Sequence, residues 1–288
     1  GNLPIATDIA AAIPWLLAAL GALLLAGLAL PRLVRPLYAM VLLVVAFGLM
    51  GAGEWRYAPS LDGVSDDERA FYLASPEGDA DDVYHSGVLA DAPAAADVDA
   101  YVHDPLAERE EGQPGPLLVY HTAPLTEPLD VAGYARLEAW IELDVPDTDI
   151  VATIEEIRPD GDRVPLAASE LRARHRHGVD RSVPVEPGVV ELYTFDRFYW
   201  FARRIPAGSR IRLTIQPLDS PQRQKNYQSG GDPMTETPAD ARTATVRLHH
   251  GPDRASRLVL PVAVEAPAGA PAGASAGASA GAAADPGG

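Results

Sequence analysis

Apolar and polar residues alternate through the second half of the chain, and this pattern predicts β-strands. Between 136 and 143, Leu137, Ala139, Ile141 and Leu143 alternate with mostly charged positions. Successive side chains of a strand point to opposite faces, so such a segment buries one face and exposes the other. Seven strands are predicted, at 117–120, 136–143, 150–157, 189–198, 210–216, 244–249 and 258–264, and the alternation is clear at 136–143, 210–216 and 244–249.

The segments between these strands are rich in Gly, Pro and Asp and carry no helical period. The run from Arg158 to Asp162 contains Asp160-Gly161, which suits a tight hairpin. Many short strands with turns between them are typical of an antiparallel sandwich. The long connection at 217–243 favours a jelly roll. We therefore predict a mainly β fold over 116–264, an antiparallel jelly-roll β-sandwich of the galactose-binding-like kind.

The N-terminal pattern is different, because two long segments carry no charge. The first covers 23 residues at 9–31 and the second covers 17 residues at 37–53. A 23-residue helix is about 35 Å long, enough for the roughly 30 Å hydrocarbon core of a bilayer. Residues 1–53 are thus predicted to form a transmembrane helical hairpin. The end of the second run, at 47–51, also fits a buried strand, and this alternative stays open.

Four residues are candidate membrane anchors. Arg32 and Arg35 lie between the two runs, and the excess of basic residues on the cytoplasmic side places that loop inside. Trp15 and Trp55 suit the two membrane–water interfaces. The hairpin would then leave the remainder of the chain on the periplasmic side of a bacterial inner membrane.

Two further segments complete the predicted organisation. Residues 54–115 are acidic and show little sustained period, so we expect a mostly irregular segment that wraps a neighbouring domain. From Glu54 to Glu111 there are 16 Asp and Glu residues against three arginines, which indicates a solvated acidic surface or a docking face for a basic partner. Residues 265–288 repeat Ala, Gly and Pro and predict a disordered tail.

Composition excludes some functions. The net charge is −17, which argues against nucleic acid as a partner. Cysteine is absent, and no spacing of residues indicates a metal or another cofactor. His249 and His250 are adjacent in a predicted strand, so their rings should point to opposite faces. Two Gly-x-Ser-x-Gly matches at 273–281 fall in the low-complexity tail, without the strand-to-helix turn that such a nucleophile needs.

Two groups of side chains are candidates for an interaction surface. The first is the run Arg172, Arg174 and Arg176, either a clamp for an anion or structural partners of the acidic segment. The second is aromatic and includes Trp140, Tyr199 and Trp200. These aromatic residues either pack in the core and against a neighbouring domain, or form a platform for carbohydrate. An exposed patch of that kind would mark a partner.

Several runs, in order along about three quarters of the chain, resemble the CocE/NonD family of α/β-hydrolases, also called the X-Pro dipeptidyl-peptidase family. The similar runs are Met50 to Arg56, Phe71 to Leu73, His85 to Leu89, Tyr101 to Pro105, Thr122 to Gly133, Asp147 to Asp149, Pro159 to Gly161, Leu171 to Arg176, Gly208 to Leu213, Lys225 to Tyr227 with Gly230-Gly231, and Ser256 to Pro261. The resemblance is to the C-terminal non-catalytic domain. The resemblance implies that the catalytic serine, aspartate and histidine belong to a preceding domain. We do not expect the residues before Met50 to form that domain. The resemblance therefore assigns no catalytic residue in this sequence.

Three functions fit these observations. The first is a membrane-anchored, non-catalytic accessory subunit, whose partners are membrane lipid and another membrane protein or complex. The second is the C-terminal part of a split or truncated hydrolase for esters or X-Pro peptides, whose triad lies on a separate α/β-hydrolase chain. The third is a carbohydrate-binding jelly roll. We expect the first, and therefore no catalysis by this chain alone.

Overall fold

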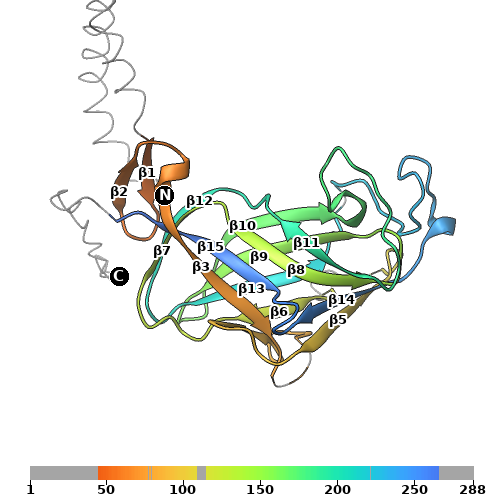
Figure 1. The fold of residues 1–288 in the computed structure, drawn as a ribbon, viewed down its shortest axis with the longest axis horizontal. Coiled ribbons are helices and arrows are strands. Elements are labelled where there is room, and N and C mark those ends of the chain that lie inside the picture. The colour runs from red at the N-terminus through yellow and green to blue at the C-terminus, as the bar shows by residue number, and fades with distance from the viewer. Residues whose placement is uncertain (1–44, 77, 79, 109–114, 221, 266–288) are drawn as a thin grey trace, which may run out of the picture.

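The chain folds into a β-sandwich with a small two-stranded hairpin at one end (Figure 1). The computed structural model describes residues 45–76, 78, 80–108, 115–220 and 222–265. Within these ranges the helical elements are three 3-10 turns, η1 (Asp62–Val64), η2 (Ala173–His175) and η3 (Pro238–Asp240). The strands are β1 (Val45–Leu49), β2 (Glu54–Ala58), β3 (Ser65–Ala74), β4 (Gly87–Ala90), β5 (Asp97–His103), β6 (Leu118–His121), β7 (Leu129–Gly133), β8 (Arg136–Leu143), β9 (Asp149–Ile157), β10 (Arg163–Arg172), β11 (Val190–Phe195), β12 (Phe201–Ile205), β13 (Arg210–Pro217), β14 (Ala244–His250) and β15 (Arg257–Ala263).

Thirteen strands form one hydrogen-bonded system in the order β10-β9-β13-β6-β4-β3-β15-β8-β14-β5, with β11 along β8 and the β7–β12 pair joined through β15. Pairing is antiparallel except between β4 and β6. β14 and β15 follow one another along the same side of β8. Ser256 bridges the gap between them, because its Oγ accepts from the backbone N–H of Trp140 and donates to the carbonyl of His249.

All seven predicted strands are present, and the period-two patterns have the expected effect. Every second residue of β8 is buried, as are Ile211, Leu213 and Ile215 of β13. The predicted turn at Arg158 to Asp162 joins β9 to β10, with Gly161 at a φ of 91°. The mainly β sandwich is thus confirmed, while the jelly-roll assignment remains a prediction.

The segment at 54–115 contributes β2 to β5, four strands that the sequence analysis did not predict. β5 escaped notice because it turns Asp99, Tyr101 and His103 inward, so its buried face is largely polar and the apolar period is lost. The first half of β3 contains four consecutive charged residues at 66–69. Because of them, the apolar second half of this strand was not recognised in the sequence.

The second transmembrane helix was wrong over its later part. Residues 45–49 form strand β1, which is the alternative left open for that run. Gly51 and Gly53 then reverse the chain at φ values of 86° and 68°, and a Cβ on Gly51 would lie 2.9 Å from the carbonyl oxygen of Arg204. A side chain would be strained there.

The first predicted helix, which contains Trp15, lies outside the described residues. The loop with Arg32 and Arg35 and the tail at 266–288 also lie outside them. Among the residues with assigned positions, no helix is long and apolar enough to cross a membrane. Trp55 lies in β2 and is 49% exposed.

The β1–β2 hairpin is held against the sandwich by a small apolar cluster of its own. Phe47 and Leu49 are buried there against Val64, Ala132 and Ala202. The ring of Phe47 also meets that of Trp200 edge-on, with centroids 6.3 Å apart.

Charged groups reinforce the same junction. Arg56 contacts Asp130 of β7, and Arg204 of β12 donates to Asp130 at 2.7 Å and to Glu54 at 2.9 Å. Burial tends to raise the pKa of Asp130, but the hydrogen bonds from Arg204 and Arg56 outweigh it and hold that pKa below its usual range. The hairpin is therefore fixed to β7 and β12 by apolar and ionic contacts together.

Stability should fall on acidification because of His121 in β6. Its Nε2 accepts from Arg212 Nε at 2.8 Å, and burial with the neighbouring Arg212 and Arg210 lowers its pKa to about 4. Between that value and the ordinary 6.5, the unfolded chain binds the proton and the folded chain does not. The free energy of unfolding should drop by about 1 kcal/mol from about pH 7 to about pH 5 through this group, after allowance for solvent screening.

Urea unfolding at the two pH values checks this, with His121→Gln as the comparison. The glutamine oxygen still accepts from Arg212 but does not titrate, so the variant should lose less stability than the wild type. Equal losses in the two proteins would contradict the prediction.

Candidate functional site

The arginine run lies where β10 ends and η2 begins, so its side chains leave the strand in different directions. Arg172 is the last residue of β10 and binds Asp149 through two contacts of 2.7 and 2.8 Å. The hydrogen bond that Arg172 donates to Asp149 raises the pKa of the guanidinium. Arg176 donates to Glu191 of β11 at 2.6 Å and to the carbonyl of Val183 at 2.8 Å.

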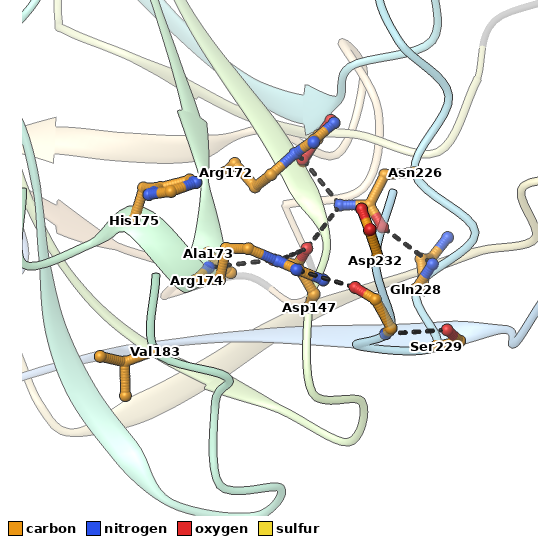
Figure 2. Close-up of polar contacts among 12 residues, drawn as sticks. Asp147, Arg172, Ala173, Arg174, His175, Val183, Asn226, Gln228, Ser229 and Asp232 are labelled. Atoms are coloured by element: carbon orange, nitrogen blue, oxygen red, sulfur yellow. Dashed lines mark hydrogen bonds and ion pairs between the residues drawn. The ribbon is translucent and has the colours of Figure 1, made fainter. Parts of the chain in front are cut away.

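Arg174 is the buried member of the run. Its Nε donates to Asp147 at 2.6 Å, its backbone N–H donates to the same carboxylate at 2.9 Å, and its Nη1 reaches the carbonyl of Gly231 at 2.8 Å (Figure 2). Asp147 is fully buried. Burial raises the pKa of Asp147 above its usual range, even against the hydrogen bonds from Arg174.

Asn226 joins the two aspartates. Its Nδ2 donates to Asp147 at 3.0 Å and to Asp149 at 2.8 Å, while its Oδ1 accepts the backbone N–H of Gln228 (Figure 2). Gln228 has a φ of 66°, so this cap fixes a left-handed turn. The cluster therefore ties the 217–243 connection to the start of β9.

The arginine run thus makes structural contacts within the sandwich. Each guanidinium meets a carboxylate, and the clamp for an external anion stays a prediction. The partners also differ from those predicted, because Asp147, Asp149 and Glu191 belong to the sandwich and not to the acidic segment. The sequence showed Asp147 to Asp149 and the arginines as separate runs, and only folding brings them together.

A second polar cluster, centred on Asp99 of β5, was missed by the sequence analysis. Asp99 Oδ2 accepts from Ser75 at 2.5 Å and from Tyr120 at 2.5 Å, and it lies 3.1 Å from Nε2 of His250. All four side chains are buried. Burial tends to raise the pKa of Asp99, but the contacts with His250, Ser75 and Tyr120 hold it below its usual range.

This cluster has the residue types of a hydrolytic triad but not the geometry. In a triad the serine hydroxyl is hydrogen-bonded to histidine, which withdraws its proton, and the carboxylate orients the histidine from the other side. Here Ser75 and His250 both meet the same oxygen of Asp99. The cluster joins β3, β5, β6 and β14 and exposes no nucleophile.

The two adjacent histidines point to opposite faces, as predicted. His250 faces Asp99 in the interior, whereas His249 lies 3.1 Å from Glu142 and 3.2 Å from Arg254 on the outer face. Burial lowers the pKa of His249.

A third polar group is local to one turn. Asp81, Asp82 and His85 bring their potential ligand atoms within 4.8 Å of one another. Asp82 caps the turn by accepting the backbone N–H groups of Tyr84 and His85, and this bonding lowers the pKa of its exposed carboxyl. The contacts are those of an aspartate-capped turn on the surface.

The predicted aromatic surface is divided by the fold. Tyr193, Phe195, Phe198 and Phe201 are buried in the main core. Trp140 is half-buried on β8, opposite Leu192 of β11 and His249 of β14. Trp200 is half-buried against Phe47, while Tyr199 is 68% exposed. The structure thus places Trp140 and Trp200 in different surroundings.

Grooves open at more than one place on the described part of the sandwich, and two of them border the candidate residues. The first, about 460 Å³, lies between β10 and β11 and is lined by residues of both strands, by His175 and by His177. The second, about 490 Å³, covers the outer faces of β6, β9, β10 and β13 and extends to Val83 and Tyr199.

The fold is a β-sandwich, and the charged side chains of its polar clusters are engaged in structural contacts. The chain belongs to the family of X-Pro dipeptidyl-peptidase C-terminal non-catalytic domains, whose family model matches residues 43–259. This match confirms the resemblance predicted from the sequence.

Individual proteins agree with that assignment. The chain is 27% identical over 158 residues to a cocaine esterase of a Rhodococcus species, covering 55% of this chain and 26% of the esterase. It is 28% identical over 172 residues to a putative serine esterase of Mycobacterium tuberculosis, covering 53% and 25%. The chain thus spans about a quarter of the length of these relatives.

Among solved structures, an aminopeptidase from a marine sediment Thaumarchaeota archaeon aligns with a TM-score of 0.65 and 21% identity, covering 76% of this chain and 40% of that one. An α-amino acid ester hydrolase aligns with a TM-score of 0.65 and 20% identity, covering 76% and 41%. These alignments show the shared fold.

Replacing Asp99 should be among the most destabilising changes in the chain. Asp99→Ala leaves His250, Ser75 and Tyr120 buried without their common acceptor, so the free energy of unfolding should fall by about 3 kcal/mol. Urea denaturation measures it. Asp91→Ala is the control, because the Asp91 side chain is 82% exposed and binds only Arg69; a loss below about 0.5 kcal/mol is expected there. Similar losses for the two variants would contradict the structural role of the cluster.

Proposed function

We propose that this chain is a non-catalytic accessory module that is tethered to a membrane and holds a second protein chain against its β-sandwich. The observation that carries the proposal is the family match at 43–259, because the matched domain is by its description non-catalytic. The arrangement of Ser75, Asp99 and His250 supports it, since these groups are committed to buried structural contacts.

The second groove suits a protein partner. Tyr199 and Val83 are 68% and 49% exposed beside it. Within it, Arg212 pairs with Glu155 at 3.5 Å. A mixed surface with exposed aromatic and aliphatic groups and paired charges is typical of protein interfaces, and large exposed apolar groups of this kind mark partners.

The tether is the uncharged run at 9–31. Its 23 residues are enough to cross a bilayer as a helix. The basic loop with Arg32 and Arg35 would face the cytoplasm, so the sandwich would lie on the periplasmic side of an inner membrane. The partner is then a membrane protein or a protein held close to the membrane.

The experiment is extraction of the full chain from its native membrane in a mild detergent, followed by size-exclusion chromatography with light scattering. We expect a complex heavier than the 30.5 kDa chain, with one co-eluting protein in constant ratio. Tyr199→Asp should shift at least about half of the chain to the monomer, because a charge in the groove must be desolvated on binding.

Tyr134→Asp is the matched control, because Tyr134 is 62% exposed between β7 and β8, away from the groove, and this variant should keep the complex. A lone monomer for the wild type would end the proposal. Equal behaviour of the two variants would place the interface on another surface.

A second candidate is one part of a split hydrolase. It is favoured by the short span of the chain on its relatives, whose names describe esterases. The same experiment separates the two, because a co-eluting α/β-hydrolase with a serine nucleophile and ester hydrolysis by the complex would support the second. Carbohydrate binding gains no support, since Trp140 and Trp200 do not share a surface environment.

A further inference from the structure

We propose that the outer face of the β1–β2 hairpin, formed by Trp55 and Tyr57, is a docking surface for the interface of a lipid bilayer. The inference rests on the membrane tether of the proposed function and names the described residues that would contact lipid. It also replaces the second transmembrane helix with a strand hairpin that lies on the membrane.

The hairpin has two different faces. Gly48 is opposite Trp55 and Ala46 is opposite Tyr57 in the antiparallel register. Alternation therefore puts Trp55 and Tyr57 on one face and Arg56 and Ala58 on the other. The second face is buried against the sandwich, so the aromatic face must point outward.

The indole lies flat over the neighbouring strand. Three atoms of the Trp55 ring lie 3.7 to 3.8 Å from the position that a Cβ on Gly48 would take. A Cβ at this position would make ordinary van der Waals contact with the ring, so the indole packs directly on the strand. The aromatic face is thus supported from below while it stays open to its surroundings.

Four exposed large apolar side chains lie on the hairpin and in the turn that follows it. Met50 is 59% exposed, Trp55 49%, Tyr57 56% and Leu61 59%. The charged side chains of the hairpin do not share that exposure, because Glu54 is paired with Arg204 and Arg56 with Asp130. On a protein surface that faces water, charged side chains are normally the exposed ones and large apolar side chains are more often buried.

The position of the hairpin in the chain identifies the occupant. The second uncharged run begins at Leu37 and leads directly into β1, and no charged residue occurs from Leu37 to Gly53. Any bilayer that receives the preceding apolar runs is therefore close to the hairpin. Tryptophan and tyrosine are the residues enriched at membrane–water interfaces, where a ring is half in an apolar and half in a wet environment.

The surroundings of the face indicate which kind of lipid contact is made. Asp62, Asp66 and Asp67 follow the hairpin and add negative charge. Anionic headgroups would be repelled, so the contact depends on apolar insertion and not on charge.

Such a contact would orient the whole sandwich. The hairpin lies at the opposite end of the molecule from β5 and β14 (Figure 1). Because Phe47, Leu49 and the Arg204–Glu54 pair fix it to the sandwich, lipid contact at Trp55 would set the angle at which the domain stands on the membrane.

The test is fluorescence quenching in the full chain reconstituted into phosphatidylcholine vesicles. One protein keeps only Trp55, through Trp15→Phe, Trp140→Phe and Trp200→Phe. The matched control keeps only Trp140 and replaces Trp55 by Phe. With bromine atoms on the acyl chains close to the headgroups, we expect the emission of Trp55 to fall at least about twofold while that of Trp140 is unchanged.

The outcomes separate this inference from the tether. If the chain floats with the vesicles but Trp55 and Trp140 are quenched equally, the hairpin does not contact lipid and the inference fails, while the tether stands. If the chain does not float at all, both fail. Quenching of Trp55 that appears only when phosphatidylserine is added would overturn the apolar basis of the contact.

Discussion

The cost of burying a carboxylate is the constraint on which this sandwich depends. An ionised carboxyl group removed from water is stable only when hydrogen bonds and opposite charges replace its hydration. Asp99, Asp147 and Glu156 are all buried, and each collects partners from distant parts of the chain. Asp147 brings η2 and the 217–243 connection together, and Glu156 of β9 takes Arg203 of β12 and Ser209. These contacts fix loops that the apolar core alone would leave unspecified.

The same contacts explain why residues with catalytic or binding character do not form an active site here. Arg172, Arg174 and Arg176 look like a basic patch along the sequence, yet each is engaged by a carboxylate of the sandwich. The serine, aspartate and histidine of the Asp99 cluster are similarly committed. The surfaces that remain open include the grooves and the aromatic face of the hairpin.

The candidate surfaces could be predicted only in part. Trp55 was selected from its place after an apolar run, and it is exposed on the hairpin. Tyr199 was selected together with its aromatic neighbours. It is largely exposed, whereas Trp200 is half-buried. The Asp99 cluster carried no signal, because its four members are separated by up to 175 residues, from Ser75 to His250, and each is unremarkable in its own segment.

The sequence by itself determined the seven strands with alternating residues, the turn at Gly161 and the family. These features are local, since the period of two and the backbone freedom of glycine act within a few residues. Tertiary structure decided the rest. Whether residues 45–49 become a strand depends on the fit of Phe47 and Leu49 against Ala132 and Ala202, and whether β5 forms depends on partners for Asp99. Such choices rest on contacts between residues far apart in the chain, which local pattern does not encode.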